Sequence, residues 1–432
     1  MKVLLLSHSF NSLTQRFWVE LERCGHTLSM ELDINDQVTI EAVEQFQPDI
    51  IIAPYLKRAI PEIIWKHHRC IIIHPGIIGD RGPSALDWAI LNNEEEWGVT
   101  ALQADSEMDA GDVWAEARFP MRSTRKSSLY HNEITGAAVT TLHQVLKACT
   151  DTSFVPIPLN DNLSTITGKW MPPIRQQERL INWQQDSTQL ALHKLQSADG
   201  YPGVLDELYG APYYLFDAHA ESKFKGFAGD VIAIRHNAIC RATKDGAIWI
   251  GYLKSPGGIK LPATQLLAKH LDNIPEKLLP LDLGRIEETY QDIAYQENNG
   301  IGYLYFDFYN GAMSAERCER LHHAYEYARN RDTKIIALMG GDDFWSNGID
   351  LNTIEAVEQF QPDINAMNDL CQSIITTTDK MVIAAMRGNA AAGGVFMALG
   401  ADYIFARQGI ILNPHYKNMG NLYGSEYWTY LL

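Results

Sequence analysis

A histidine and two aspartates follow apolar segments of the chain, where their side chains could act together. His74 ends the apolar run CIIIH (70–74), and Asp109 and Asp112 lie in the loop DSEMDAGD. Ligands of α/β folds bind outside the carboxyl ends of strands, so a strand-end histidine is well placed. A histidine and a carboxylate can stabilise an oxyanion and move a proton during acyl transfer. Spacing alone also allows a structural role for His74.

Two glycine-rich turns in the last third of the chain could stabilise a developing anion. The segments GGDDFWSNGIDL (340–351) and MRGNAAAGGVFMALGAD (386–402) each include or follow a strand end, and the second leads into a helix. Such turns expose backbone N–H groups, and a helix N-terminus adds a favourable field. Two converging N–H groups would form an oxyanion hole for a thioester carbonyl. Tight turns that need positive φ are the alternative explanation.

Alternating apolar and amphipathic stretches must position the first pair of groups. The sequence predicts strands at 3–6, 49–56, 70–78, 97–104 and 112–119, and helices at 13–24, 39–46 and 85–93. Ser84 is expected to cap the last of these helices. This alternation indicates an α/β domain with a largely parallel sheet.

The pattern changes near Thr165 and again near Tyr290. A stretch with two prolines (169–183) is typical of a linker, and the short strands and turns after it suggest a small β-barrel or meander. Beyond Tyr290, strands are expected at 300–309 and 333–341, a helix at 315–330, and strand, turn, helix and strand within 381–407. The last region is therefore α/β again.

Composition narrows the function classes. The 432 residues include 36 Lys and Arg against 53 Asp and Glu, a formal charge of -17, which argues against general binding of nucleic acid or anionic membranes. Six cysteines without a C-x-x-C pair favour reduced thiols over a disulfide framework or a zinc site, so no metal is expected. The apolar run at the N-terminus is too short for a signal peptide, and no spanning segment is expected. We expect a cytoplasmic protein.

The twelve-residue segment TIEAVEQFQPDI occurs identically at 39–50 and at 353–364. No wider repeat surrounds the two copies. The first copy leads into a predicted strand, whereas the second precedes a polar, helix-like stretch. No function is assigned to the second copy.

The motif H-P-G-x-x-x-x-R-G-P at His74, followed by D-A-G-D, resembles the 10-formyltetrahydrofolate-dependent formyltransferases. The resemblance runs from Met1 to about Leu283 and implies a Rossmann-like catalytic domain followed by a small OB-like barrel. It implies that His74 and Asp109 flank the formyl group. It also implies substrate-binding roles for residues around the two loops, namely Gly76, Gly79, Arg81 and Gln103.

This chain departs from the formyltransferase motif at one position. The family pattern is Asn-x-His, with the asparagine helping to hold the oxyanion, but Ile72 stands two residues before His74. Loss of one oxyanion donor costs on the order of 3–4 kcal/mol elsewhere. Gln103 is a candidate replacement. Otherwise the chemistry of the acceptor differs from that of ordinary amine formylation.

The two glycine-rich turns together resemble the enoyl-CoA hydratase/isomerase (crotonase) superfamily, from about Tyr290 to the last residue. The motif S-x-G-x-D-L is present at 346–351, and an altered glycine triplet is present at 392–394. The resemblance implies oxyanion donors at the backbone N–H groups of Ile349 and Gly393, with Gly348 and Gly394 lining the acyl-CoA site. This implies a third domain that is crotonase-like and, ending at 432, looks C-terminally truncated.

Both carboxylates of the hydratases are missing from this region. Phe396 stands in place of the first, and His415 in place of the second. Ordinary hydration of an enoyl thioester is therefore not expected. A new polar cluster lies where the superfamily keeps catalytic groups, and His415, Tyr416 and Glu426 are its candidate catalytic residues, beside Tyr423. A polar loop with a helix beginning at Ser425 is the alternative.

The combination of the two families resembles the HypX/HoxX-type hydrogenase maturation proteins. It implies formyl transfer from 10-formyltetrahydrofolate to coenzyme A, followed by decarbonylation of formyl-CoA to carbon monoxide, a ligand of the iron in [NiFe]-hydrogenase. The implied partners are the hydrogenase large subunit or its maturation machinery. The domains expected are 1–168 (formyltransferase), 169–199 (linker), 200–285 (barrel-like) and 290–432 (crotonase-like).

Two other functions stay open at this point. One is a formyltransferase that acts on an amine, such as an aminosugar or aminoacyl-tRNA, with a vestigial crotonase-like domain. The negative charge weakens the tRNA version, since tRNA binding needs a basic face. The other is a maturation scaffold without catalytic activity.

Overall fold

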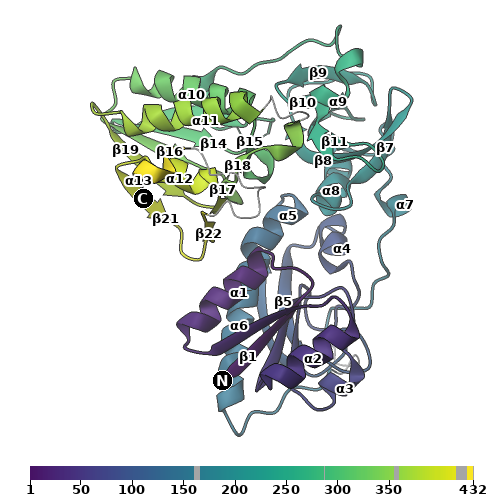
Figure 1. Ribbon diagram of the computed structural model, residues 1–432. Coiled ribbons are helices and arrows are strands. Elements are labelled where there is room, and N and C mark those ends of the chain that lie inside the picture. Colours follow the sequence, from purple (N-terminus) through teal and green to yellow (C-terminus); the bar gives the residue numbers. More distant parts are fainter. Residues whose placement is uncertain (160–165, 287, 355–359, 415–425, 432) are drawn as a thin grey trace. The chain divides into compact units, whose positions relative to one another are not determined.

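The computed structural model describes residues 1–159, 166–286, 288–354, 360–414 and 426–431, without the side chain of Phe360. The chain divides into two compact units. The first comprises residues 1–179 and 196–200, and the second comprises residues 180–195 and 201–432. Figure 1 labels the elements of both units, and each unit is described separately.

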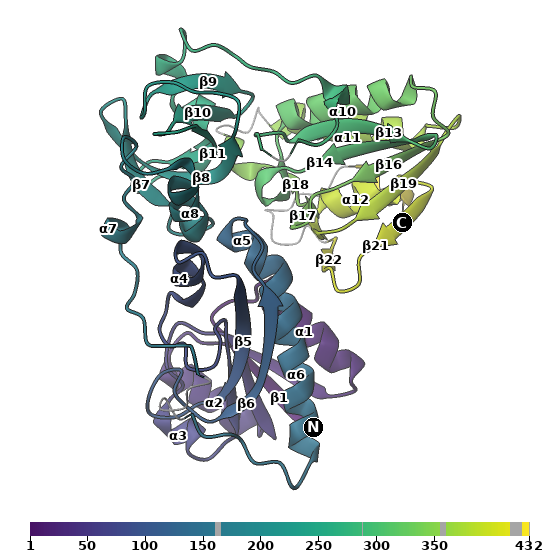
Figure 2. The same ribbon diagram turned by 180° about the vertical axis from the view of Figure 1, so that it is seen from behind.

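The first unit is built on a six-stranded sheet with the order β2-β1-β3-β4-β5-β6 (Figures 1 and 2). Its strands are β1 (Lys2–Ser7), β2 (Thr27–Leu32), β3 (Ile50–Tyr55), β4 (Cys70–His74), β5 (Glu96–Gln103) and β6 (Val113–Pro120). The first four strands pair in parallel, as predicted, whereas β5 pairs antiparallel with both β4 and β6. The sheet is therefore mixed, with its antiparallel part next to the strand that carries His74.

Helices cover both faces of this sheet because its buried strands are apolar on both sides. The helices are α1 (Ser12–Arg23), α2 (Asp36–Phe46), α3 (Glu62–Trp65), α4 (Ala85–Leu91), α5 (Lys126–Leu129), a π-helical turn (Tyr130–Ile134), α6 (Thr135–Thr150) and α7 (Gln176–Arg179). Phe17 of α1 and Leu142 of α6 share one core cluster, while Val43 of α2 and Ile64 of α3 share the cluster on the other face. This three-layer arrangement is typical of α/β domains.

The second unit begins with an antiparallel sheet of order β7-β8-β11-β10-β9, with β12 paired to β11. Its elements are β7 (Val204–Leu208), β8 (Ala211–Glu221), β9 (Val231–Arg235), β10 (Ala238–Ala242), β11 (Ala247–Lys254), β12 (Lys260–Pro262) and α9 (Ala263–Leu266). The predicted run of short strands is confirmed. Helix α8 (Thr188–Ala198) precedes these strands in the chain.

A second α/β layer system follows in the same unit, with the sheet order β13-β14-β16-β19-β21. The strands are β13 (Ile293–Asn298), β14 (Ile301–Phe306), β16 (Ile335–Met339), β19 (Met381–Met386) and β21 (Tyr403–Ala406). Helices α10 (Ala315–Arg329) and α11 (Phe360–Ile375) contribute Tyr325 and Leu370 to the core cluster that also contains residues of this sheet. Apart from the β13–β14 hairpin, the strands are parallel.

Two small sheets lie at the ends of these parallel strands and carry the glycine-rich turns. One pairs β15 (Ala312–Met313) with β18 (Gly348–Ile349), and the other has the order β17-β20-β22. The remaining elements are β17 (Phe344–Ser346), β20 (Asn389–Ala391), α12 (Gly393–Leu399), β22 (Leu412–Asn413) and α13 (Trp428–Leu431). The short strands follow the carboxyl ends of the strands of the larger sheet and hold the two turns there.

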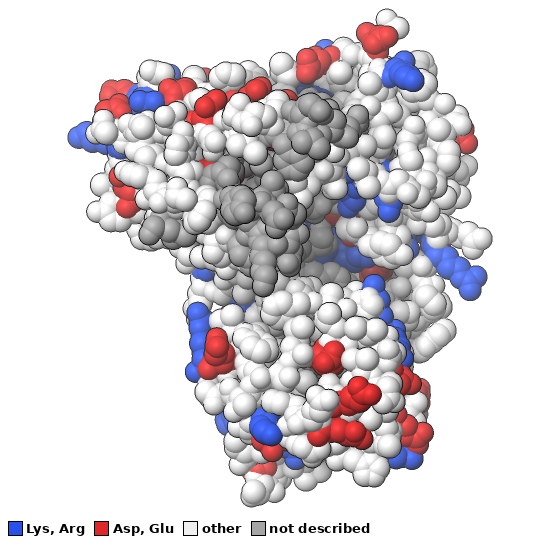
Figure 3. Space-filling model, viewed as in Figure 1, with Lys and Arg blue, Asp and Glu red and all other residues white. Residues whose placement is uncertain are grey.

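Among the described residues, no helix is both long enough and apolar enough to cross a membrane. Figure 3 shows acidic and basic side chains scattered among uncharged ones on one face of the molecule.

Candidate functional sites

His74 is the last residue of β4 and is buried, with 4% of its surface exposed. The loop after it is fixed to β5 by two hydrogen bonds. Thr100 Oγ1 donates to the carbonyl of Gly76 at 2.8 Å, and Trp97 Nε1 donates to the carbonyl of Pro75 at 2.9 Å. The antiparallel pairing of β4 with β5 thus holds both the ring and the loop that follows it.

The ring of His74 lies between two carboxylates. Its Nε2 is 2.8 Å from Asp80 Oδ2, and its Nδ1 is 3.6 Å from Asp109 Oδ1. Burial opposes a positive ring, but the hydrogen bond with Asp80 and the charges of Asp109 and Asp80 together raise the pKa of His74. The structure thus brings together the predicted pair, His74 and Asp109, and adds Asp80, which the sequence analysis did not select.

Asp109 reaches the ring from the loop between β5 and β6. It adopts a left-handed conformation, with φ of +57°, and its Oδ2 lies 3.4 Å from the N–H of Gly82. A side-chain carbon at Gly111 would come within 1.9 Å of the carbonyl oxygen of Gln103, so the D-A-G-D turn needs its glycine. Asp112 is exposed, and its backbone carbonyl accepts the N–H of Gln103.

The other residues predicted to bind substrate in this unit surround the same loop. Arg81 donates from Nη1 to Glu107 Oε1 at 2.8 Å. Gly79 has φ of +88°, and a side-chain carbon there would come within 2.4 Å of Ile166 Cγ2. Gln103 ends β5 and is half-buried. Gly79 and Arg81 follow His74 closely in the chain, whereas Gln103 pairs with Ile71 and so points to the face of the sheet opposite to Ile72 and His74. The roles of these residues in binding stay predictions.

Ile72 lies two residues before His74, so its side chain points to the same face of β4. It is half-buried and packs against the core cluster that contains Ile51 and Cys70. An apolar side chain here has an apolar neighbourhood. The side chain of Ile72 has no hydrogen-bond donor, so it cannot hold an oxyanion as the asparagine of the family pattern does.

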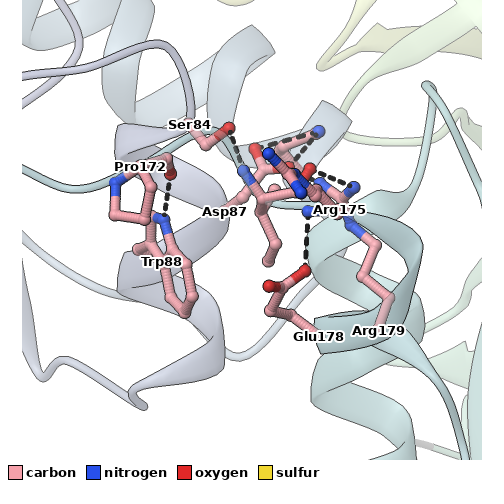
Figure 4. A network of polar contacts seen from close by, with 9 residues as sticks. Ser84, Asp87, Trp88, Pro172, Arg175, Glu178 and Arg179 are labelled. Atoms are coloured by element: carbon pink, nitrogen blue, oxygen red, sulfur yellow. Dashed lines mark hydrogen bonds and ion pairs between the residues drawn. The ribbon is translucent and has the colours of Figure 1, made fainter.

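The segment 166–179 is fastened to the loop and helix that follow His74. Arg81 N–H donates to the carbonyl of Lys169, and Met171 N–H donates to the carbonyl of Arg81. Further along, Trp88 Nε1 of α4 donates to the carbonyl of Pro172 at 2.9 Å (Figure 4). Residues 169–179 of the predicted linker therefore belong to the first unit.

Asp87 of α4 anchors the far end of that segment through a buried ion pair. Its Oδ1 accepts from Arg179 Nη2, and both its oxygens accept from Lys126 Nζ, at 3.0 and 3.1 Å (Figure 4). The predicted position of Ser84 at the N-cap of α4 is confirmed. Its side chain, however, makes no capping bond, and its Oγ accepts the N–H of Ile174 at 3.2 Å.

The two glycine-rich turns of the second unit meet. A side-chain carbon at Gly348, where φ is +79°, would lie 3.2 Å from the backbone nitrogen of Gly393. One at Gly394 would lie only 2.1 Å from the carbonyl oxygen of Ser346, so this contact requires glycine. Ile349 follows Gly348 in β18, so the two predicted donors lie on adjoining turns.

Hydrogen bonds on either side hold these turns in place. Gly348 N–H donates to Ser346 Oγ at 3.0 Å, and the indole N–H of Trp345 donates to the carbonyl of Gly394 at 2.9 Å. Asp350 lies 3.7 Å from the guanidinium of Arg317, with both groups buried. Burial raises the pKa of Asp350, although Arg317 opposes the shift.

Glu426 is the member of the predicted polar cluster that the structure places at the turns. It is buried, and a side-chain carbon at Gly393 would come within 2.1 Å of its Oε1. Its backbone N–H donates to Asn368 Oδ1 at 2.7 Å, a contact from α11 that the sequence analysis missed. Phe396 is buried, and its ring lies 6.4 Å from that of Trp428. His415, Tyr416 and Tyr423 lie outside the described residues.

Three family models match the chain. A formyl transferase model matches residues 25–146, a formyl transferase C-terminal domain model matches residues 173–271, and an enoyl-CoA hydratase/isomerase model matches residues 296–425. The fold class predicted from sequence, with two formyltransferase domains and a crotonase-like domain, is confirmed.

Two hydrogenase maturation proteins are similar to the whole of this chain. The hydrogenase maturation factor HoxX of Bradyrhizobium diazoefficiens is 50% identical over 438 residues, which cover all of this chain and 76% of that protein. The crystal structure of HypX from Aquifex aeolicus in complex with tetrahydrofolic acid is 46% identical, with a TM-score of 0.96, over all of this chain and 76% of that one. Methionyl-tRNA formyltransferase of Nitrosomonas eutropha is 28% identical over 232 residues, covering 53% of this chain and 72% of that enzyme.

Proposed function

The chain belongs to the HoxX/HypX family of hydrogenase maturation factors, and we propose that it makes carbon monoxide for the hydrogenase iron in two steps. In the first, a formyl group passes from 10-formyltetrahydrofolate to coenzyme A. In the second, formyl-CoA releases carbon monoxide. The tetrahydrofolate complex of the similar HypX supports the folate, and the match to the enoyl-CoA hydratase/isomerase model supports the thioester.

The first step needs a group to stabilise the formyl oxygen and a group to handle the thiol proton. The C–N10 bond of the folate breaks, a C–S bond forms, and the thiol proton ends on N10. His74 would stabilise the charge that develops on the formyl oxygen, and Asp109 would accept and pass on the proton. Asp109 suits this role because its side chain keeps 11% exposure beside a buried ring, so substrate can reach it.

A thiol acceptor agrees with the apolar residue at Ile72. Amine formylation produces a charged, strongly solvated intermediate at the acceptor nitrogen, which polar groups near the formyl carbon would stabilise. A thiolate that attacks the formyl carbon leaves no such charged nitrogen. Attack by either acceptor places negative charge on the formyl oxygen, so a change of acceptor is compatible with Ile72 but does not replace the missing oxyanion donor.

The second step needs an oxyanion site and one group that moves a proton. The formyl hydrogen leaves as a proton, the C–S bond breaks with its electron pair on sulfur, and carbon monoxide departs. The sulfur then takes back the proton to give coenzyme A. The backbone N–H groups of Ile349 and Gly393 would hold the carbonyl, and Glu426, against Gly393, would carry the proton.

The observation that carries this proposal is the position of His74 Nδ1, 3.6 Å from Asp109 Oδ1, at the end of β4. The direct test mixes the full chain with 10-formyltetrahydrofolate and coenzyme A and looks for formyl-CoA by mass spectrometry. Formyl-CoA, or free carbon monoxide formed from it, is expected with the wild type and not with His74→Ala. Transfer to an amine but not to coenzyme A would favour the amine formyltransferase, and no transfer at all would favour the scaffold.

The partner of this pathway would be the immature hydrogenase large subunit or another maturation factor. The family name supports involvement in hydrogenase maturation. Carbon monoxide is small and uncharged, so its delivery needs no charged channel. A chain that carries both activities would release carbon monoxide only at the place where it also makes formyl-CoA.

A further inference from the structure

One nitrogen of the His74 ring is hydrogen-bonded to the carboxylate of Asp80, which occupies a variable position of the family motif. Asp80 Oδ2 is 2.8 Å from Nε2, which is hydrogen-bond distance, whereas Asp109 Oδ1 is 3.6 Å from Nδ1, which is beyond it. Asp80 is 3% exposed, so water does not compete for its oxygens. The two ring nitrogens therefore differ: a carboxylate lies at hydrogen-bond distance from Nε2, whereas the carboxylate that faces Nδ1 is farther away.

The chain builds the His74–Asp80 contact with two glycines. A side-chain carbon at Gly76 would lie 2.4 Å from His74 Nε2 and 2.5 Å from Asp80 Oδ2, so only glycine leaves room for the pair. A side-chain carbon at Gly168 would lie 2.1 Å from the backbone nitrogen of Asp80. The Asp80 N–H itself donates to the carbonyl of Ile77 at 2.9 Å. The backbone thus fixes Asp80 from both sides.

An ionised carboxylate can only accept a hydrogen bond, so Nε2 carries a proton. With Nε2 committed, Nδ1 is the ring nitrogen left for the substrate. A neutral ring would then present a lone pair at Nδ1 to Asp109 and to the formyl oxygen, and both contacts would repel. A ring that is protonated on both nitrogens would instead donate from Nδ1.

We propose that Asp80 is a positioning residue for formyl transfer: it holds the proton on Nε2 of His74 and keeps the ring cationic, so that Nδ1–H meets the formyl oxygen. This inference rests on the proposed formyl transfer at His74. Among the described residues, the charged groups that act on the ring are Asp80 and Asp109. Asp109 faces Nδ1 and can exchange protons with the acceptor, while Asp80, on the far edge, takes no part in the exchange.

The direction of pH dependence follows. A histidine that must be protonated is active below its pKa and loses activity as the pH rises through it. The raised pKa of His74 moves that loss above the ordinary value of 6.5. Asp80→Asn keeps an oxygen for Nε2–H but removes the charge, so the alkaline limb should move to lower pH by about one unit.

The test measures the pH profile of kcat/KM for formyl transfer in the wild type and Asp80→Asn. The matched control is Asp112→Asn, an exposed aspartate of the neighbouring loop. Gly76→Ala is a second variant, which disturbs the same contact through space and leaves the charge in place. Both Asp80→Asn and Gly76→Ala should move the alkaline limb downward, and Asp112→Asn should not. A loss that is equal at every pH, with the limb unmoved, would show that Asp80 is only structural.

A second readout separates this inference from the proposed reaction. Nitrogen-15 NMR of labelled histidine reports protonation at Nε2 and Nδ1 of His74 without any substrate. The wild-type ring should titrate above 6.5, and the Asp80→Asn ring should titrate lower. If the wild type transfers no formyl group but the titration shifts as expected, the proposed reaction fails and the pairing stands. An unshifted titration in an active enzyme would overturn the role of Asp80.

Discussion

The carboxylate of Glu426 lies against the Cα of Gly393, where a side-chain carbon on Gly393 would come within 2.1 Å of Oε1. This places an acid group beside one of the two backbone N–H groups proposed to hold the thioester carbonyl. The hydratase carboxylates are absent from their own positions, where Phe396 and His415 stand. Glu426, the proton carrier that we propose, therefore comes from a different segment of the chain.

Gly393→Ala should impair the second step alone. The added carbon would displace the Glu426 carboxylate, and carbon monoxide release should fall on the order of 10²-fold, as when one acid/base group is lost. Formyl-CoA should accumulate, because His74 belongs to the other compact unit. The control is Gly136→Ala in α6, where an added carbon meets nothing within 4 Å. Equal carbon monoxide release by both variants would remove Gly393 from the site.

Glu426→Gln keeps the shape of the side chain and removes its ability to carry a proton. We expect formyl-CoA to build up and carbon monoxide release to drop by about 10²-fold or more, as for the loss of one acid/base group. Rapid-quench mass spectrometry of the thioester checks this. Tyr416→Phe, at a position outside the described residues, tests the predicted polar cluster in the same assay. If neither variant slows release, the cluster is structural.

His74→Ala and Asp109→Asn should each reduce formyl transfer by about 10²-fold or more, because each removes one of the two groups that we propose act on the formyl group. Tetrahydrofolate should still bind to both, which isothermal calorimetry can measure. Asp112→Asn serves as the control, since it is exposed in the same loop as Asp109. Near-normal transfer by either variant would reject the assignment.

Ile72→Asn separates two explanations of the missing asparagine. If the site is adapted to a thiol, the variant should transfer no faster to coenzyme A, and a polar side chain in this apolar neighbourhood should slow it. If the chain is a decayed amine formyltransferase, the variant should formylate amines faster. Measuring both acceptors with both proteins distinguishes them. Faster amine transfer together with no coenzyme A activity in either form would favour the amine enzyme.

The sequence predicted elements well where local pattern and burial agree. The strand predicted at 70–78 is β4, which covers only Cys70–His74, because the apolar run stops at His74 and the Pro-Gly loop follows. The antiparallel direction of β5 was not predicted, since strand direction depends on the path of the chain and not on the strand's own residues.

The repeated segment shows the limit of local reasoning most directly. In the first copy, α2 ends at Phe46, Gln47 adopts φ of +52°, and Ile50 begins β3. In the second copy, the same letters from Phe360 onward open helix α11. Proline is compatible with both places, after a helix end and in a first helical turn. Tertiary surroundings therefore decide between two conformations of one sequence.

Asp80 was missed for a related reason. The letters G-D-R-G are typical of a turn, and aspartate is common in turns without any role in chemistry. The sequence does contain one indication, because glycine at positions 76 and 79 suggests close packing in the loop that includes Asp80. Only the three-dimensional path of the loop brings Asp80 back to Nε2 of His74. Glu426 and Asn368 meet in the same way, across 58 residues of sequence.

The central claim is that one chain converts a folate formyl group into carbon monoxide through formyl-CoA. The most direct measurement supplies 10-formyltetrahydrofolate labelled with carbon-13 in the formyl group, with coenzyme A, to the wild type and to Glu426→Gln in the presence of a haem protein. We predict labelled carbon monoxide on the haem with the wild type, none without coenzyme A, and labelled formyl-CoA in its place with Glu426→Gln. Labelled carbon monoxide formed equally well without coenzyme A, or a labelled amine product and no carbon monoxide, would contradict the account.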